Sequence, residues 1–366
     1  MVTSGVDSDS TVTALAVALP ARYRHGVNSR SGTRGSTGIA IALLAAASVA
    51  GGCAFDGPMS TLVAGSDLNR SILSLYSIIT WAAAIIAAVV FVVLGLILLR
   101  YREQPGADGL PRQIRGHTAL ELAWTIAPAL ILLVIAIPTI QVIFRTQGAA
   151  APPANALAVT VRGWQWWWEF RYPSLDVVTA NELHLPVGRP VVFSLEGPDV
   201  IHSFWVPQLG GKRDVVPGRI NQVTLTPERA GEYWGQCAEF CGASHANMGL
   251  RVIVEEPSVF ERWVAAQKTP PPEPAGAAAE GKAMYTRSAC VGCHTIRGVS
   301  AGTLGPDLTH FGGRALFGAG LWPTNVETVT AWLKDPPALK PGAKMPNLNL
   351  SDAEARALAV YLTSLK

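Results

Sequence analysis

The stretch Cys237–Met248 reads CAEFCGASHANM, with the spacing Cys-x-x-x-Cys-x-x-x-His-x-x-Met. A second histidine, His202, lies upstream in DVIHSFWVP. Two thiolates, two imidazoles and a thioether form a soft, electron-rich donor set that suits copper. Two cysteines on one short loop can each bridge two copper ions, so that each copper takes one histidine. The pattern therefore predicts a binuclear copper centre.

Two other interpretations of this loop remain open. Zinc is the main alternative, because closely spaced Cys and His residues often bind it. Met248 argues against zinc, and so does the β-rich character of the surrounding sequence. A disulfide between Cys237 and Cys241 is the second alternative.

The β-rich character of this region is inferred from short β-type runs that are bounded by Gly, Pro or Asn. Such runs predict a sandwich or barrel of roughly 100 residues. The runs are 157–161, 191–195, 222–226 and 250–254.

A second cysteine motif lies nearer the C-terminus. Residues 290–294 read CVGCH, in which two thiols can add to the haem vinyl groups while His294 becomes the proximal iron ligand. A CxxC pair alone could also be a redox pair or half a zinc site. The adjacent histidine, the helical surroundings and a downstream methionine favour haem. Met345 is the candidate distal ligand, and His310 is expected to be ordinary polar surface.

The N-terminal part of the chain predicts a membrane anchor. The apolar segments 72–99 and 120–144 are each long enough, at ~1.5 Å per residue, to cross a hydrocarbon core of roughly 30 Å. The loop between them is rich in arginine, which places it in the cytoplasm and both outer ends of the hairpin outside. Covalent haem attachment requires the same outer face. We therefore expect a plasma membrane protein whose two redox domains lie outside or in the periplasm.

The first residues predict a leader. An arginine-containing flank precedes a short apolar core, 39–50, and small residues follow it, as in a signal peptide. Cys53 comes directly after those small residues, which resembles a lipidation site. The predicted organisation is leader 1–52, transmembrane hairpin 53–148, copper domain 149–267, Pro/Ala linker 268–279 and cytochrome domain 280–366.

Composition agrees with this organisation. The chain has 366 residues, too many for one ordinary domain. Its 49% hydrophobic and 15% charged residues are typical of a membrane protein with soluble parts. A net charge of +3 without a long basic run gives no support for nucleic-acid binding.

With these motifs in place, residues 181–254 resemble the CuA domain of cytochrome c oxidase subunit II. The segments GPDVIHSFWVP, KRDVVPGRINQ and GQCAEFCGASHANM match that family in type and order. The resemblance covers residues 71–366 when the hairpin and a fused cytochrome are included. It implies a multidomain membrane protein with a two-helix transmembrane hairpin, a cupredoxin-like β-barrel and an all-α class I cytochrome c domain.

The resemblance also implies roles for the residues of the copper loop. Cys237 and Cys241 would be bridging ligands, and His202 and His245 terminal ligands. The axial ligands would be Met248 and the backbone carbonyl of Glu239. The carboxylate of Glu239 would help to bind a magnesium ion at the boundary with subunit I.

Two further roles follow from the resemblance. The cluster Trp164-Gln165-Trp166-Trp167-Trp168 matches the family's Gln-Trp-Tyr-Trp pattern, with Trp167 in place of the tyrosine. It marks Trp166 as the residue through which electrons enter. Glu121, in GHTALELAWTIAP, would lie at the entrance of a proton path into subunit I. An acid at a membrane boundary is also tolerated simply because it reaches water.

The implied function is the electron-input subunit of a respiratory cytochrome c oxidase. Electrons would pass from a c-type cytochrome or a cytochrome bc complex, through covalent haem c and CuA, to subunit I. There oxygen is reduced to water while protons are pumped, so the oxygen-reducing site is on another chain. The alternatives are the electron-input subunit of a CuA-containing nitric oxide reductase, or a free-standing membrane electron carrier. The fused cytochrome and Glu121 favour the oxidase.

Overall fold

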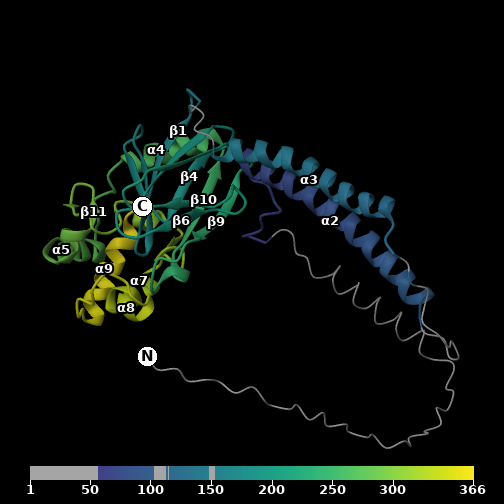
Figure 1. The fold of residues 1–366 in the computed structure, drawn as a ribbon. Coiled ribbons are helices and arrows are strands. Elements are labelled where there is room, and N and C mark those ends of the chain that lie inside the picture. Colours follow the sequence, from purple (N-terminus) through teal and green to yellow (C-terminus); the bar gives the residue numbers. More distant parts are fainter. Residues whose placement is uncertain (1–56, 103–112, 114, 148–152) are drawn as a thin grey trace, which may run out of the picture. The chain divides into compact units, whose positions relative to one another are not determined.

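The computed structural model describes residues 57–102, 113, 115–147 and 153–366 (Figure 1). The predicted leader and Cys53 lie outside the described residues. The described chain contains two long helices, a β-rich domain and a C-terminal helical domain, and the multidomain fold class expected from the sequence is confirmed.

The long helices are α2, Asp67–Arg100, and α3, Thr118–Gln147. Both are long and apolar enough to cross a membrane, and the apolar stretch of each is unburied within the structure. α2 begins before residue 72 because its first turn is held by polar contacts that hydropathy does not detect. Ser66 caps the helix, and the Asp67 carboxylate accepts a hydrogen bond from the Thr226 N–H at 2.7 Å.

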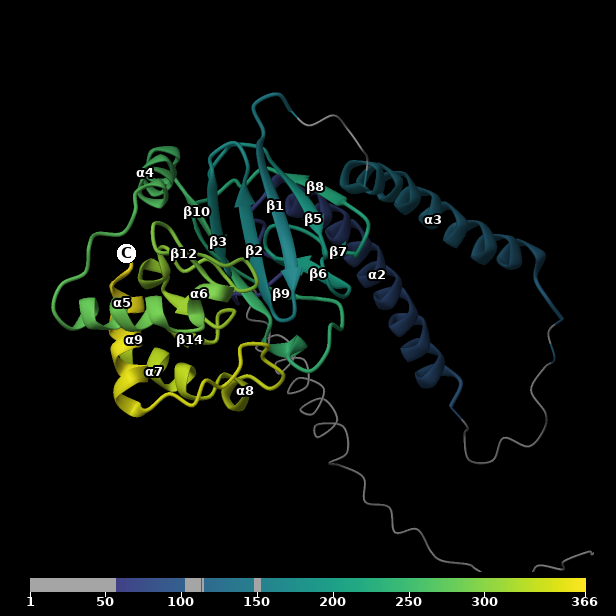
Figure 2. The ribbon, with the colours of Figure 1, turned by 90° about the vertical axis from the view of Figure 1, so that its left-hand side faces the viewer.

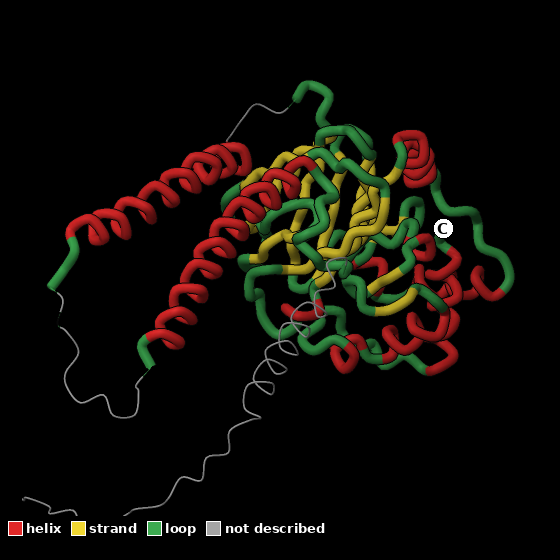
Figure 3. Tube along the Cα trace, turned by 90° about the vertical axis from the view of Figure 1, so that its right-hand side faces the viewer, coloured by secondary structure: helices red, strands yellow, loops and turns green. Residues whose placement is uncertain are grey.

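The β-rich domain consists of two five-stranded sheets, ordered β3-β2-β1-β5-β8 and β4-β10-β9-β6-β7 (Figures 2 and 3). β1 pairs in parallel with β5, and β4 with β10, while the remaining pairs are antiparallel. The strands are β1 Leu157–Trp164, β2 Trp167–Tyr172, β3 Val177–Ala180, β4 Glu182–Pro186, β5 Val191–Glu196, β6 His202–Trp205, β7 Arg213–Val215, β8 Asn221–Leu225, β9 Gly231–Cys237 and β10 Gly249–Glu255. All four predicted strands lie within β1, β5, β8 and β10 to within one residue.

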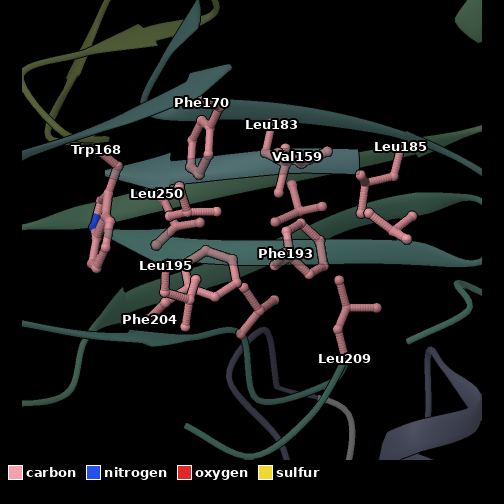
Figure 4. Close-up of a cluster of buried hydrophobic side chains, with 14 of the residues drawn as sticks. Val159, Trp168, Phe170, Leu183, Leu185, Phe193, Leu195, Phe204, Leu209 and Leu250 are labelled. Atoms are coloured by element: carbon pink, nitrogen blue, oxygen red, sulfur yellow. The ribbon is translucent and has the colours of Figure 1, made fainter. Parts of the chain in front are cut away.

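The two sheets meet in a core of buried aromatic and aliphatic side chains (Figure 4). Phe204 of β6 contacts Trp168 and Phe170 of β2 edge to face, with ring centroids 5.7 and 6.4 Å apart. It also packs against Phe193 of β5 at 5.6 Å. Large apolar surfaces buried in this way, at about 25 cal/mol per Å², supply the main favourable term for folding. Phe204 therefore joins the two sheets.

Helix α4, Pro257–Lys268, leads from β10 to the C-terminal domain. That domain contains α5 Ala277–Arg287, α6 Cys290–Cys293, α7 Val326–Lys334, α8 Pro336–Leu339 and α9 Asp352–Ser364. α9 begins with a capping box, formed by Ser351 and Glu354. α5 contacts α9 closely, and a Cβ at Gly281 would collide with the Ala357 carbonyl. The contact therefore needs a glycine at this position.

Short ribbons and single-turn helices complete the described part of the chain. Two ribbons are present, β11 Thr295–Ile296 with β12 Ser300–Ala301 and β13 Leu316–Phe317 with β14 Trp322–Pro323. The single-turn helices are η1 His245–Asn247 and η2 Phe311–Gly313.

The expectation that His310 is polar surface is wrong. Its side chain is buried and its Nε2 lies 3.2 Å from the Gln267 carbonyl, a contact between segments distant in sequence.

One buried polar cluster joins the β-rich domain to α4. His184 of β4 lies between two carboxylates, with Nδ1 3.2 Å from Glu255 and Nε2 3.2 Å from Glu182. Trp263 of α4 stacks on its ring at 4.1 Å. Burial opposes the charge on the ring, but the hydrogen bonds to the two carboxylates prevail and raise the pKa of His184.

This raised pKa makes stability depend on pH in a defined direction. A group whose pKa is higher in the folded state contributes its full stabilisation below its unfolded pKa of about 6.5, and loses it as the pH rises through the folded value. We expect His184→Gln to lower the free energy of unfolding more at acidic than at alkaline pH. Denaturant unfolding followed by circular dichroism at both pH values measures this difference. The prediction would be contradicted if the difference in free energy of unfolding between the unmodified protein and the variant were constant, or if it grew as the pH rises.

Candidate metal centres

The residues predicted to bind copper lie together at one end of the second sheet. β9 ends at Cys237 and β6 begins at His202, and pairing of Phe204 with Cys237 sets these strands side by side. The His202 Nδ1 is 3.9 Å from the Cys237 Sγ. His202, Cys237 and Cys241 offer ligand atoms within 4.8 Å of one another, and all three residues are buried. Tertiary pairing thus joins the upstream histidine to the loop.

Inside the loop, each sulfur has its own set of neighbours. The Cys237 Sγ is 3.2 Å from the Glu239 carbonyl. The Cys241 Sγ is 3.6 Å from the His245 Nδ1 and 3.8 Å from the Met248 Sδ. The single turn η1 carries His245 and is followed directly by Met248, so the turn brings both side chains back toward Cys241. All the predicted donors of the loop therefore converge.

The donor set fits a pair of soft metal ions. The two sulfur atoms are 3.8 Å apart, far longer than a disulfide bond of about 2.05 Å, and both cysteines are free. Two thiols, two imidazoles, a thioether and a carbonyl give more donors than the four of a structural zinc site. Soft sulfur and imidazole donors favour copper.

The two thiols are electrostatically coupled. The hydrogen bond between their sulfur atoms lowers the pKa of Cys237 and raises the pKa of Cys241. Such behaviour is expected where two close acidic groups share a proton. Metal binding would replace that proton, because a thiolate and not a thiol is the ligand.

Asp199 orients His202, a role that the sequence analysis did not assign. The Asp199 Oδ1 lies 2.9 Å from the His202 Nε2, and its carboxylate accepts the backbone N–H groups of Gln165 and Val200 at 2.7 Å each. Burial works against the charge of Asp199, but these hydrogen bonds lower its pKa. Burial also opposes the charge of His202, but its hydrogen bonds to Asp199 and Cys237 raise its pKa. The sequence signal for this orienting role is the position of Asp199, three residues before His202 in the segment DVIH.

The carboxylate of Glu239 has different surroundings from its carbonyl. It is 43% exposed and pairs with the Lys212 Nζ at 3.2 Å. Glu121 lies in the first turn of α3, where its side chain is exposed and accepts the His117 N–H at 3.3 Å. The magnesium and proton-path roles of these two residues stay predictions.

A cavity of about 490 Å³ contains the second cysteine motif. Cys290, Cys293, His294 and Met345 all line it, so the structure brings together every residue predicted to hold haem. The remaining walls are mostly apolar and aromatic, and the volume lies in the range of roughly 300–1,000 Å³ that is usual for ligand pockets. The cavity therefore fits a large, flat, apolar cofactor such as haem.

The candidate iron ligands are held in place by neighbouring groups. The His294 Nδ1 is 2.8 Å from the Pro306 carbonyl, which leaves Nε2 as the available ligand atom, and Gly305 lies directly beside the ring. Burial lowers the pKa of His294 and favours the neutral ring that binds metals. The Trp332 indole N–H donates to the Met345 Sδ at 3.3 Å. Gly305 and Pro306 thus pack beside His294, the candidate proximal histidine.

Residues from the copper domain form part of the same cavity wall. Trp164 and Trp167 line it and stack on each other, with ring centroids 5.9 Å apart. Trp166 also lines it and is buried. Its indole N–H donates to the Cys241 carbonyl at 3.0 Å, and the Gln165 side-chain amide donates to the same oxygen at 2.8 Å. One indole thus contacts both the cavity and the copper loop.

Comparisons with known proteins agree with this arrangement. Three family models match: "Cytochrome C oxidase subunit II, transmembrane domain" at residues 58–142, "Cytochrome C oxidase subunit II, periplasmic domain" at 175–256, and "Cytochrome c" at 278–366. Cytochrome c oxidase subunit 2 of Alkalihalophilus pseudofirmus is 38% identical over 288 residues, which are 77% of this chain and 84% of the relative. The Bacillus subtilis protein of the same name is 35% identical over 292 residues, 74% of this chain and 81% of the relative.

Among solved structures, the periplasmic domain of subunit II of cytochrome oxidase from Bradyrhizobium japonicum is 32% identical, with a TM-score of 0.31. The match covers 32% of this chain and 96% of that one.

Fold and sites together define a membrane protein of copper and haem electron transport. The chain belongs to the cytochrome c oxidase subunit II family and carries a C-terminal cytochrome c domain. It is therefore a subunit of a haem-copper oxidase and associates with other oxidase subunits.

Asp199 provides a test of the copper site. Removing a group that orients a metal-binding histidine typically weakens metal affinity by about 10- to 100-fold, so we expect Asp199→Asn to bind copper less tightly by that amount. Asp214→Asn is a matched control, since Asp214 accepts a hydrogen bond from Ser203 on the neighbouring strand. Copper retained by each purified protein in competition with a chelator measures the effect. Equal retention by both variants would argue against a positioning role for Asp199.

Proposed function

We propose that this chain is the electron-input subunit of a respiratory cytochrome c oxidase. A c-type cytochrome or a cytochrome bc complex would supply electrons to a haem bound in the cavity. From there they would pass by way of the CuA loop to subunit I, where oxygen is reduced to water while protons are pumped. The observation that carries the proposal is the position of Trp166, which lines the cavity and donates a hydrogen bond to the Cys241 carbonyl.

The ligand assignments follow from the converging donors. Cys237, Cys241, His202, His245, Met248 and the Glu239 carbonyl would hold the two copper ions. Cys290 and Cys293 would attach haem covalently, and His294 and Met345 would bind its iron. When bound, both groups would supply the means to accept and release single electrons.

The residues around these groups keep their surroundings fixed during electron transfer. His202, Cys237, Cys241 and Met248 are all buried, which keeps water away from the donors. Asp199 fixes one imidazole, and the Trp332 N–H contacts the Met345 thioether. Fixed ligands with little access to water rearrange little when charge changes, which speeds electron transfer. Trp166 supplies a buried aromatic contact between the two regions.

The proposed orientation places both redox domains on the outer face of the plasma membrane. Arg100 ends α2, and the loop from α2 to α3 adds Arg102, Arg112 and Arg115. These arginines outnumber the acids of the loop, which favours the cytoplasmic side. Subunit I would meet the chain near the membrane. The exposed carboxylate of Glu239 would there be able to exchange Lys212 for a magnesium ion, and Glu121 would lie at a proton path.

Oxygen turnover tests the function as a whole. The purified oxidase complex should consume oxygen when it is given a reduced c-type cytochrome. Cys237→Ser should abolish both this turnover and the mixed-valence copper signal in electron spin resonance, because serine offers no thiolate to share between two metals. Asp214→Asn, on the neighbouring strand β7, is the control and should keep both. Turnover of nitric oxide without oxygen consumption would favour a nitric oxide reductase, and a copper signal that survives in Cys237→Ser would refute the ligand assignment.

Met345 provides a separate test of the haem site. We expect Met345→Ala to lose the absorption band that arises from a thioether bound to ferric haem, since alanine has no sulfur to bind iron. Met284→Ala, on α5, removes a thioether that packs near the same core and should leave the band unchanged. Persistence of the band in Met345→Ala would place the distal ligand elsewhere.

A further inference from the structure

Lys340 is a buried lysine whose recorded partners in the described part of the chain are two carbonyl oxygens. Its Nζ donates to the Trp166 carbonyl at 2.7 Å and to the Gly318 carbonyl at 3.1 Å. The residue is 4% exposed and lines the haem cavity. Trp166 belongs to the turn between β1 and β2, while Gly318 belongs to the turn between β13 and β14. One amino group thus connects the copper domain to the cytochrome domain.

A lysine in this position is costly, which argues for a specific role. Burial of an ammonium group without a carboxylate partner is unfavourable. Burial indeed lowers the pKa of Lys340 to about 7. A lysine amine carries N–H donors in both protonation states, so it can hold the carbonyls whether or not it is charged. A merely space-filling role would be served equally well by an apolar side chain.

The two residues that follow Lys340 contact the copper loop and Trp166. The Ser244 hydroxyl, in the copper loop, donates to the Pro341 carbonyl at 2.6 Å. Gly342 has φ +82°, and a Cβ there would lie 2.8 Å from the Trp166 ring. Segment 340–342 therefore contacts Trp166 on its carbonyl and on its ring, while the indole N–H remains bonded to Cys241.

We propose that Lys340 is a positioning residue, which holds Trp166 in place between the haem cavity and the copper loop. This inference rests on the proposed function, because the position matters only if electrons pass between these two regions. Lys340 acts through Trp166 and need not touch either metal centre.

Lys334 offers a matched control within the same domain. It is the last residue of α7, is about half exposed and pairs with the Asp352 carboxylate, and it is not among the residues that line the cavity. Replacing either lysine by methionine keeps the aliphatic stem and removes one positive charge. The two variants therefore differ in the interdomain hydrogen bonds that they lose.

The experiment compares Lys340→Met with Lys334→Met in the complete oxidase. After photochemical reduction of the fused haem, transient absorption follows reoxidation of the haem and reduction of copper. Loss of the hydrogen bonds to two buried carbonyls is expected to slow this internal step by about tenfold or more in Lys340→Met. Haem and copper spectra and the rate of haem reduction by the external donor should stay unchanged. Lys334→Met should transfer internally at the unmodified rate.

A second measurement does not depend on electron transfer. Hydrogen exchange, read by mass spectrometry, should show faster deuterium uptake in peptides that contain residues 165–167 in Lys340→Met, but not in Lys334→Met. If Lys340→Met does not assemble, Lys340→Gln supplies a shorter side chain with N–H donors, for which we expect an intermediate internal rate. The internal transfer rate and the deuterium uptake of Lys340→Gln then test the positioning role.

The possible failures are distinguishable. Absence of haem-to-copper transfer in the unmodified oxidase would overturn the proposed function. Normal transfer in the unmodified oxidase, together with unchanged transfer and exchange in the Lys340 variant, would overturn the positioning role alone. Equal slowing in both lysine variants would also overturn it, because the shared loss of charge would then explain the effect.

Discussion

The pairing of β6 with β9 is the constraint on which the copper site depends. Phe204 lies opposite Cys237, and its ring is locked in the core against Trp168, Phe170 and Phe193. Because side chains alternate between the faces of a strand, a slip of one residue would move His202 to the opposite face of the sheet. The aromatic core therefore fixes the position of His202, a proposed metal ligand. The stability of the β-rich domain and the geometry of the donor set are linked in this way.

The turn between β1 and β2 connects that site to the cytochrome domain. Gln165 and Trp166 both donate to the Cys241 carbonyl, and the Trp166 carbonyl accepts from Lys340. The turn is thus bonded to the copper loop by its side chains and to the cytochrome domain by its backbone. A buried indole held on both sides is well suited to the proposed transfer, since neither its distance to Cys241 nor its surroundings can vary freely.

Several features of the protein could be predicted from the sequence because they depend on short-range spacing. The copper loop and the CVGCH motif hold their chemistry within a few residues, so the donor types alone indicate soft metals and haem. Continuous apolar length predicts the two long helices, and Ser351 with Glu354 predicts the start of α9. The strands that carry few branched apolar residues, such as β6 and β7, were not found, because their burial arises from neighbouring strands.

The sequence by itself predicted which residues would hold metals and determined which segments are long and apolar enough to cross a membrane, since both rest on local composition. Only the tertiary structure decided how the parts meet. Asp199 lies within hydrogen-bond distance of His202, and His310 is buried against the Gln267 carbonyl. The contact of Asp67 with Thr226 holds the start of α2, and Lys340 donates to the Trp166 carbonyl. Except for Asp199, these contacts join residues that are far apart along the chain. Their partners are chosen by the packing of sheets and helices, which no short motif encodes.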